Sequence, residues 1–187
     1  MERRDFLKSA CVAGLCSCTV AGLLAGDETT SAAPASPALP PPEDWRIAFG
    51  KQRYSKLVST VAAKVDEKTF GDIIEEVGRF CSSSGMAGKF IGDIDGYLAE
   101  AKKRWGSQSE YNREEGVVNF SFQTGGDCAC PLMSRGLVPL AACRCSVGAI
   151  RQSFTVVSQR TVECKLKESA LQNGTRCSFE IRLGQPA

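Results

Sequence analysis

The chain has 187 residues, of which 43% are hydrophobic and 24% charged, and its formal net charge is +2. This balance fits one ordinary globular domain with extra residues at one end, and without a basic stripe it argues against nucleic-acid binding. The chain contains no His, which excludes imidazole metal ligands and the usual catalytic base.

The first residues predict an export signal. The stretch Glu2-Arg3-Arg4-Asp5-Phe6-Leu7-Lys8 fits a twin-arginine signal, an apolar run follows over 10–25, and Ser31-Ala32-Ala33 offers a cleavage site. The run is shorter than the roughly 20 residues that span a bilayer, which favours a cleaved signal over a membrane anchor. Lipid attachment at Cys18 is an alternative. We expect residues 1–33 to be read by the twin-arginine translocase, so that the protein is periplasmic or extracytoplasmic.

Composition also predicts the domain boundary. Residues 34–43 are rich in Pro and Ala and include three consecutive prolines at 40–42, a composition that suits a stiff, solvated linker. Residues 44–187 then form a single domain.

Three helices are predicted in the first half of this domain. Hydrophobic residues recur at steps of three and four over 44–65, 67–81 and 88–105. Asp66 is placed to cap the second helix, Gly106 ends the third, and Gly50 offers a point of interruption in the first. The aromatic residues of the first helix, such as Trp45 and Phe49, are expected in the core.

The second half changes period. Alternation predicts a strand over 118–122, a helix follows over 144–158, and two further strands over 162–166 and 177–183 flank a hairpin signal at Asn173-Gly174. The order predicts an α+β fold, in which N-terminal helices pack on one face of a small antiparallel sheet and one helix is inserted before a C-terminal hairpin.

The stretch 125–148 carries the most specific chemistry. Cys128 and Cys130 form one C-x-C pair, and Cys143 and Cys145 form a second. Four thiolates satisfy a tetrahedral structural zinc site. These four cysteines are therefore the predicted metal ligands, with zinc as the expected ion, and the nearby Arg135, Arg144 and helix N-terminus are expected to favour the thiolate form.

Other thiol chemistry stays open. Cleavage after the signal leaves an odd number of cysteines, which are Cys81, Cys128, Cys130, Cys143, Cys145, Cys164 and Cys177. The two pairs could form crossed disulfides, since neighbours in a C-x-C bond to each other only with strain, or they could serve redox or ligand-binding roles. Cys164 and Cys177 are interpreted as small buried groups, as a bonded pair if the hairpin centres near 170–171, or as a source of one further metal ligand. Cys81 is interpreted as buried or as the odd thiol. No catalytic residue is selected, because no carboxylate has an evident partner and no cysteine has a His base.

The C-terminal stretch resembles a known family. Residues 168–181 are similar to the closing hairpin of 4-vinyl-reductase-type small-ligand-binding domains and of the thiazoline-carboxylate hydrolase family, with Leu171, Cys177, Phe179 and Ile181 in register. The order from Cys143 to Leu166 resembles a cysteine-rich branch of that group. The resemblance covers about 70 residues from Val117 onward and implies a small-ligand-binding fold, mostly of cytoplasmic sensors and enzymes. Ser169 stands where that pattern can place a metal-binding Cys, so we expect the metal at the upstream pairs.

Three hypotheses follow. The first is an exported protein that binds a metal ion or another small ligand through its cysteine pairs. The second is a hydrolase acting on a small cyclic thioether or amide. The third is a disulfide-stapled interaction domain.

Overall fold

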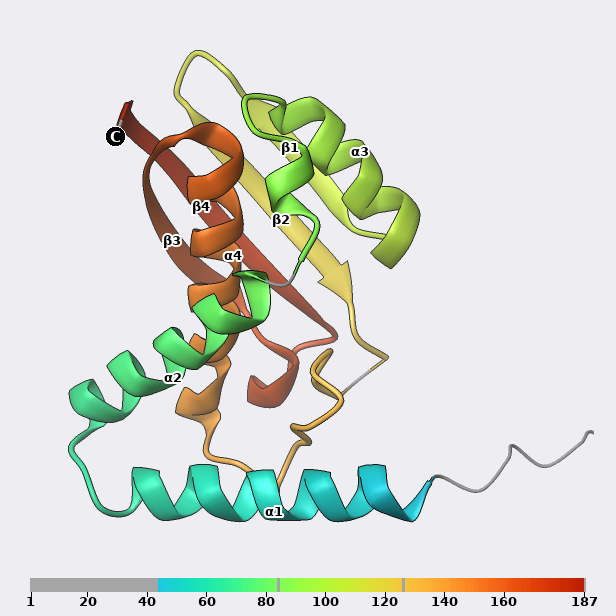
Figure 1. The fold of residues 1–187 in the computed structure, drawn as a ribbon, viewed down its shortest axis with the longest axis vertical. Coiled ribbons are helices and arrows are strands. Elements are labelled where there is room, and N and C mark those ends of the chain that lie inside the picture. The colour runs from blue at the N-terminus through green and yellow to red at the C-terminus, as the bar shows by residue number, and fades with distance from the viewer. Residues whose placement is uncertain (1–43, 84, 126, 187) are drawn as a thin grey trace, which may run out of the picture. The chain divides into compact units, whose positions relative to one another are not determined.

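The computed structural model describes residues 44–83, 85–125 and 127–186 (Figure 1). The elements in chain order are α1 (Trp45–Ala62), α2 (Glu67–Ser83), α3 (Ile94–Trp105), β1 (Gln108–Asn112), β2 (Val117–Gln123), α4 (Arg144–Ser158), β3 (Arg160–Glu168) and β4 (Arg176–Pro186), with short 3-10 turns at Ala87–Lys89, Leu140–Cys143 and Ala170–Gln172. The predicted signal peptide and linker lie outside the described residues. No helix among the described ones has the length and apolar character needed to cross a bilayer.

The four strands form one antiparallel sheet in the order β1-β2-β4-β3. β1 and β2 are joined by a tight turn in which Gly116 has a φ of +64°, a conformation that L side chains rarely adopt. β3 and β4 form the predicted C-terminal hairpin, and β4 then pairs with β2 in the middle of the sheet.

Helices cover one face of this sheet. Figure 1 shows α3 and α4 lying across it, and the main core is built from Tyr97 and Phe154 of these helices against Phe120, Phe179 and other inward residues of the strands. The Tyr97 and Phe154 rings meet edge to face at 5.5 Å, and Phe120 meets Phe154 at 6.0 Å. The predicted α+β class, with helices on one face and a helix before the closing hairpin, is confirmed.

Local chemistry explains where the helices begin. Asp66 accepts hydrogen bonds from the backbone amide and the hydroxyl of Thr69 at 3.0 and 2.5 Å, as the capping prediction requires. α1 continues through Gly50 without interruption. α3 begins at Ile94 rather than at 88, because Gly92 turns the chain with a φ of +80° and the Asp93 carboxylate caps the amide of Gly96 at 2.8 Å.

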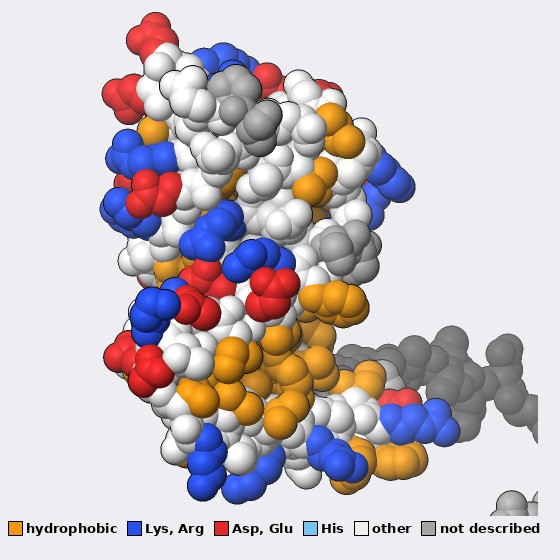
Figure 2. Space-filling model, turned by 60° about the vertical axis from the view of Figure 1, so that its left-hand side comes forward, with side chains coloured by type: hydrophobic (Ala, Val, Ile, Leu, Met, Phe, Trp, Pro, Cys, Tyr) orange, Lys and Arg blue, Asp and Glu red, His pale blue; other side chains and the backbone are white. Residues whose placement is uncertain are grey.

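One expectation about burial was wrong, and one strand was not predicted. Trp45 and Phe49 are not core residues, since 68% and 50% of their surfaces are exposed. Figure 2 shows hydrophobic side chains gathered on the lower part of the molecule near α1. The sequence does not predict β1, because four of its five residues are exposed and no alternation of hydrophobic and polar residues marks it.

The two helices α2 and α4 cross at very short range. A methyl group at Gly78 would overlap the backbone carbonyl of Cys145, and one at Gly148 would overlap the backbone carbonyl of Glu75. Only glycine leaves room for the two backbones at this distance. The contact therefore depends on two residues without side chains.

A buried ion-pair group reinforces this crossing. Glu75 of α2 is 5% exposed, and its carboxylate lies 2.7 Å from Arg144 and 2.6 Å from Arg151, both on α4. The pairing satisfies a charge that would be costly to bury alone.

We predict that Gly148→Ala lowers the free energy of unfolding of the full chain by about 3 kcal/mol, because the added methyl forces the helices apart. Urea unfolding followed by circular dichroism measures the change. Gly50→Ala is the matched control: it lies within α1 with open space around its Cα, and should raise stability by up to about 1 kcal/mol through helix propensity. Equal stability of Gly148→Ala and the wild type would contradict a tight crossing.

Candidate functional site: the cysteine cavity

The loop between β2 and α4 is organised by one carboxylate. The Asp127 side chain accepts hydrogen bonds from the backbone amides of Cys128 at 2.8 Å and Arg135 at 2.7 Å. Burial opposes ionisation of this group, but the hydrogen bonds from these amides outweigh it and hold the pKa of Asp127 below its usual value. The carboxylate thus closes residues 127–135 into a compact loop that carries the first C-x-C pair.

Arg135 fastens this loop to the connection between β3 and β4. Its guanidinium donates to the carbonyl of Ala170 at 3.1 Å and to that of Gly174 at 3.3 Å. These carbonyls belong to a segment far along the chain, so the contact exists only in the folded protein. It brings the first cysteine pair against the end of the sheet.

The second pair arrives on a helix start. Cys143 closes the 3-10 turn Leu140–Cys143, and Cys145 lies in the first turn of α4. Because the carbonyl of Cys145 packs against Gly78, the crossing with α2 fixes the position of this first turn of α4.

All four predicted cysteines line one small cavity of about 20 Å³. Cys177 of β4, Met133 and Ser169 also line it, and sequence analysis did not select the last two. The full lining is Cys128, Cys130, Met133, Ala142, Cys143, Cys145, Ser146, Leu166, Ser169, Leu171 and Cys177. Of the seven cysteines that the structure describes, five line this cavity. The cavity is otherwise lined mainly by apolar side chains.

Two sulfur contacts stand out in the cavity wall. The Cys143 thiol lies 2.6 Å from the Ser169 hydroxyl, which in turn accepts the amide of Leu171 at 3.2 Å. The sulfur of Cys128 accepts the amide of Cys130 at 3.4 Å. Ser169 therefore occupies a position beside the cysteines and contacts one of them directly.

The electrostatic environment differs from the expected one. Burial raises the pKa of Cys128 to about 11 and that of Cys145 to about 12, and it also raises the pKa values of Cys143 and Cys177. The expectation that Arg144 and Arg135 favour thiolates was wrong, because Arg144 is paired with Glu75 and Arg135 with backbone carbonyls. The raised pKa values keep Cys128, Cys143, Cys145 and Cys177 protonated near neutral pH.

The remaining cysteine predictions have mixed outcomes. Cys164 and Cys177 are both buried, but Cys164 pairs with Ile181 across the hairpin while Cys177 pairs with Phe122 of β2, so the two do not face each other. Cys81 is exposed rather than buried. No disulfide joins the described cysteines, and no three Cys, Asp or Glu side chains within the described ranges are arranged as a metal site.

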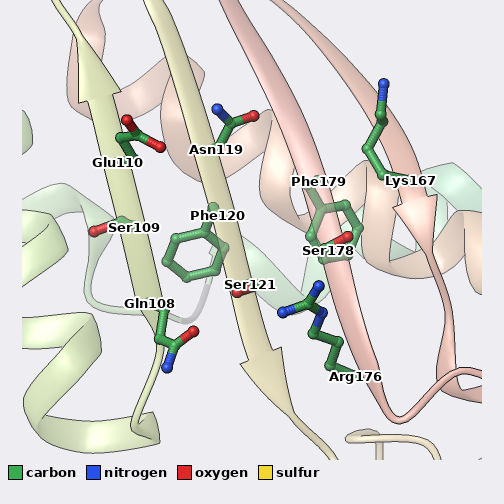
Figure 3. Close-up of a pocket in the computed structure, with 10 residues that line it drawn as sticks. All are labelled: Gln108, Ser109, Glu110, Asn119, Phe120, Ser121, Lys167, Arg176, Ser178 and Phe179. Carbon is green, nitrogen blue, oxygen red and sulfur yellow. The ribbon is translucent and has the colours of Figure 1, made fainter.

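A larger hollow lies on the open face of the sheet. This trough of about 420 Å³ is crossed by small residues such as Ser109, Ser121 and Ser178 (Figure 3). Its cations already have partners, since Lys167 lies 3.3 Å from Glu180 and Arg176 lies 2.9 Å from Glu168. None of the predicted site residues lines it.

Of the cavity residues outside the two C-x-C pairs, the sequence could have indicated only some. The alternation of Cys177 with Phe179 and Ile181 marks it as inward-facing, but its place beside the loop depends on the pairing of β4 with β2. The sequence marks Ser169 only as a position where the resembled pattern can place a metal-binding Cys, and Met133 carries no sequence signal that links it to the cysteine pairs.

Comparison with known proteins shows the fold and no family. No family model matches the chain, and no curated protein matches it. A trafficking protein particle complex subunit 3 from Naegleria fowleri, covalently bound to palmitic acid, shares 16% identity with a TM-score of 0.51, over 77% of this chain and 98% of that one. A point mutant of an H-NOX domain from Shewanella oneidensis, solved in the Fe(II)CO ligation state, shares 10% identity with a TM-score of 0.43, over 82% of this chain and 83% of that one. At 16% identity, what this chain shares with the Naegleria protein is the fold alone.

We predict slow alkylation of the cavity thiols in the native protein. A pKa near 11 leaves on the order of a hundredfold less thiolate at pH 8 than an ordinary thiol has, so iodoacetamide should modify Cys128 and Cys145 at least that much more slowly in the folded than in the denatured chain. Peptide mass spectrometry reads out each site, and Cys81 serves as the exposed internal comparison. Equal rates in the folded and denatured chains would contradict burial.

The same shifts predict a loss of stability at high pH. An unfolded thiol loses its proton near pH 8.5, whereas the folded pKa values are higher, about 11 for Cys128 and 12 for Cys145. The contribution of these thiols to stability is therefore full below about pH 8.5 and declines as the pH rises toward 11. Urea midpoints measured from pH 7 to pH 10 should fall, and a Cys145→Ala chain should show a shallower fall. A midpoint that is unchanged over this range would exclude the effect.

Proposed function

We propose that the protein binds one metal ion, zinc in the first instance, through Cys128, Cys130, Cys143 and Cys145. The observation that carries the proposal is the size and lining of the cavity. A volume of about 20 Å³ holds one atom-sized guest, since a single water needs about 10–15 Å³. Small-molecule sites are on the order of 300 Å³ or more, so an organic substrate of the hydrolase hypothesis has no room there.

The lining supports a soft ion. Sulfur is the preferred ligand of zinc and of softer ions such as Cu(I), and zinc takes four such ligands at about 2.3 Å. The loop supplies two sulfurs, the 3-10 turn and the first turn of α4 supply one each, and Cys177 brings a fifth sulfur from the sheet. Binding requires rotation of the thiol side chains into a tetrahedron.

Binding is coupled to proton release. Because their pKa values are raised, the thiols of Cys128, Cys143 and Cys145 hold their protons at neutral pH, so an ion must displace these protons and apparent affinity should rise with pH. Ser169, which contacts the Cys143 sulfur, is placed to orient that ligand by a hydrogen bond.

The predicted export route is compatible with this function. A protein that folds before translocation can take up its metal in the reducing cytoplasm, where its thiols stay unpaired. The route rests on residues 2–33 of the sequence and is part of the proposal.

Metal content tests the proposal directly. The full chain, reduced and then freed of reductant under nitrogen, is incubated with excess ZnSO₄, desalted and measured by elemental analysis; one zinc per chain is expected. Cys143→Ala and Cys145→Ala should each reduce the affinity at least tenfold in competition with a chromophoric chelator. Removal of zinc with EDTA should lower the melting temperature.

Cys164→Ala is the matched control. Cys164 is buried to the same degree as Cys143, with 6% against 7% exposure, but it lies in the main core and does not line the cavity. It should retain one zinc. A wild-type chain without zinc, or equal losses in Cys164→Ala and Cys145→Ala, would refute metal binding at this cavity.

A further inference from the structure

A third hollow shares Cys128 with the cysteine cavity and has a different chemistry. This groove of about 570 Å³ is bordered by the end of α3, the end of β2, α4 and the start of the cysteine loop. Its lining is Trp105, Phe120, Phe122, Gln123, Thr124, Cys128, Ala129 and Ile150. Its volume lies in the range of small-molecule sites, about 300–1,000 Å³, which the cysteine cavity does not reach.

The walls select against charged ligands. No Lys, Arg, Asp or Glu of the described residues lines the groove, so a carboxylate, phosphate or ammonium group would lose hydration there without gaining a partner. Three of the lining side chains are aromatic. The Phe122 ring is held by its neighbours, edge to face with Phe120 at 6.2 Å and stacked on Phe179 at 5.9 Å.

One lining residue has an unsatisfied polar atom. The Thr124 hydroxyl oxygen is buried, and it has no hydrogen-bond partner among the residues that the structure describes. A buried hydroxyl without a partner destabilises the folded state, and most such groups in folded proteins are satisfied. The oxygen has almost no accessible surface, so the Thr124 side chain must rotate toward the groove before one hydrogen-bonding group of a ligand can satisfy it.

The exposed ring of Trp105 favours a flat ligand. The residue is 55% exposed although it lines the groove, so a large aromatic surface faces solvent at the groove edge. Covering that ring with another aromatic ring removes apolar area from water and adds a favourable ring contact.

We propose that this groove binds an uncharged, planar aromatic molecule that packs against Trp105 and Phe122 and bears one polar group that hydrogen-bonds to Thr124. The site is separate from the proposed metal cavity, although Cys128 lines both. Binding of an aromatic molecule in this groove does not depend on zinc binding in the cysteine cavity.

The probe for this proposal is N-phenyl-1-naphthylamine, which is uncharged and aromatic and carries a single N–H group. The chain contains two tryptophans, so Trp45→Phe leaves Trp105 as the only tryptophan. In that background the probe should quench Trp105 emission and gain fluorescence in a saturable, one-to-one titration. The sulfonated analogue 8-anilinonaphthalene-1-sulfonate should bind at least tenfold more weakly, because its charge finds no partner.

Two variants locate the probe. Ala129 is exposed at the groove wall, so Ala129→Leu narrows the groove without disturbing the core and should weaken binding at least tenfold. Thr124→Val keeps the side-chain shape, removes the hydroxyl and should weaken binding by roughly three- to tenfold. Ser121→Val, in the trough on the open face of the sheet, is the matched control and should bind as the parent does.

The outcomes separate this proposal from metal binding. Cys143→Ala should lose zinc affinity and keep probe binding, since Cys143 does not line the groove. Probe affinity that is equal in the parent and Ala129→Leu, stronger binding of the sulfonated analogue, or an absent Trp105 response would each overturn the proposal.

Discussion

The close crossing of α2 and α4 is the constraint on which the rest of this structure depends. Gly78 and Gly148 let the two backbones touch, and Glu75 holds Arg144 and Arg151 across the same contact. Because the carbonyl of Cys145 is one of the touching groups, the crossing also sets the first turn of α4. The helix pair thereby fixes one wall of the cysteine cavity.

The opposite wall is fixed by hydrogen bonds rather than by packing. Asp127 closes the loop on itself, and Arg135 joins it to the carbonyls of Ala170 and Gly174. This arrangement uses short polar contacts to place Cys128 and Cys130 against the sheet. It also removes Arg135 from the thiols, which leaves burial as the dominant influence on the raised pKa values of the cavity cysteines.

Two hollows with different chemistry meet at Cys128. The sulfur-lined cavity has room for one ion, whereas the groove beside Trp105 has room for an organic molecule and offers it aromatic walls with one unsatisfied hydroxyl. The fold shared with the Naegleria subunit does not by itself choose between these uses. The choice rests on the side chains that this chain places around each hollow.

The sequence alone determined the class of the fold, most helix bounds, the closing hairpin and four of the five cysteines of the cavity, because these follow from local periodicity, capping and spacing. Tertiary structure decided what local patterns do not encode. It placed Cys177, Met133 and Ser169 beside the cysteine pairs, turned Arg144 toward Glu75, exposed Trp45, and separated Cys164 from Cys177 by the register of β4. The physical reason is that contacts between distant segments depend on strand pairing and helix crossing, and these are set by the whole chain at once.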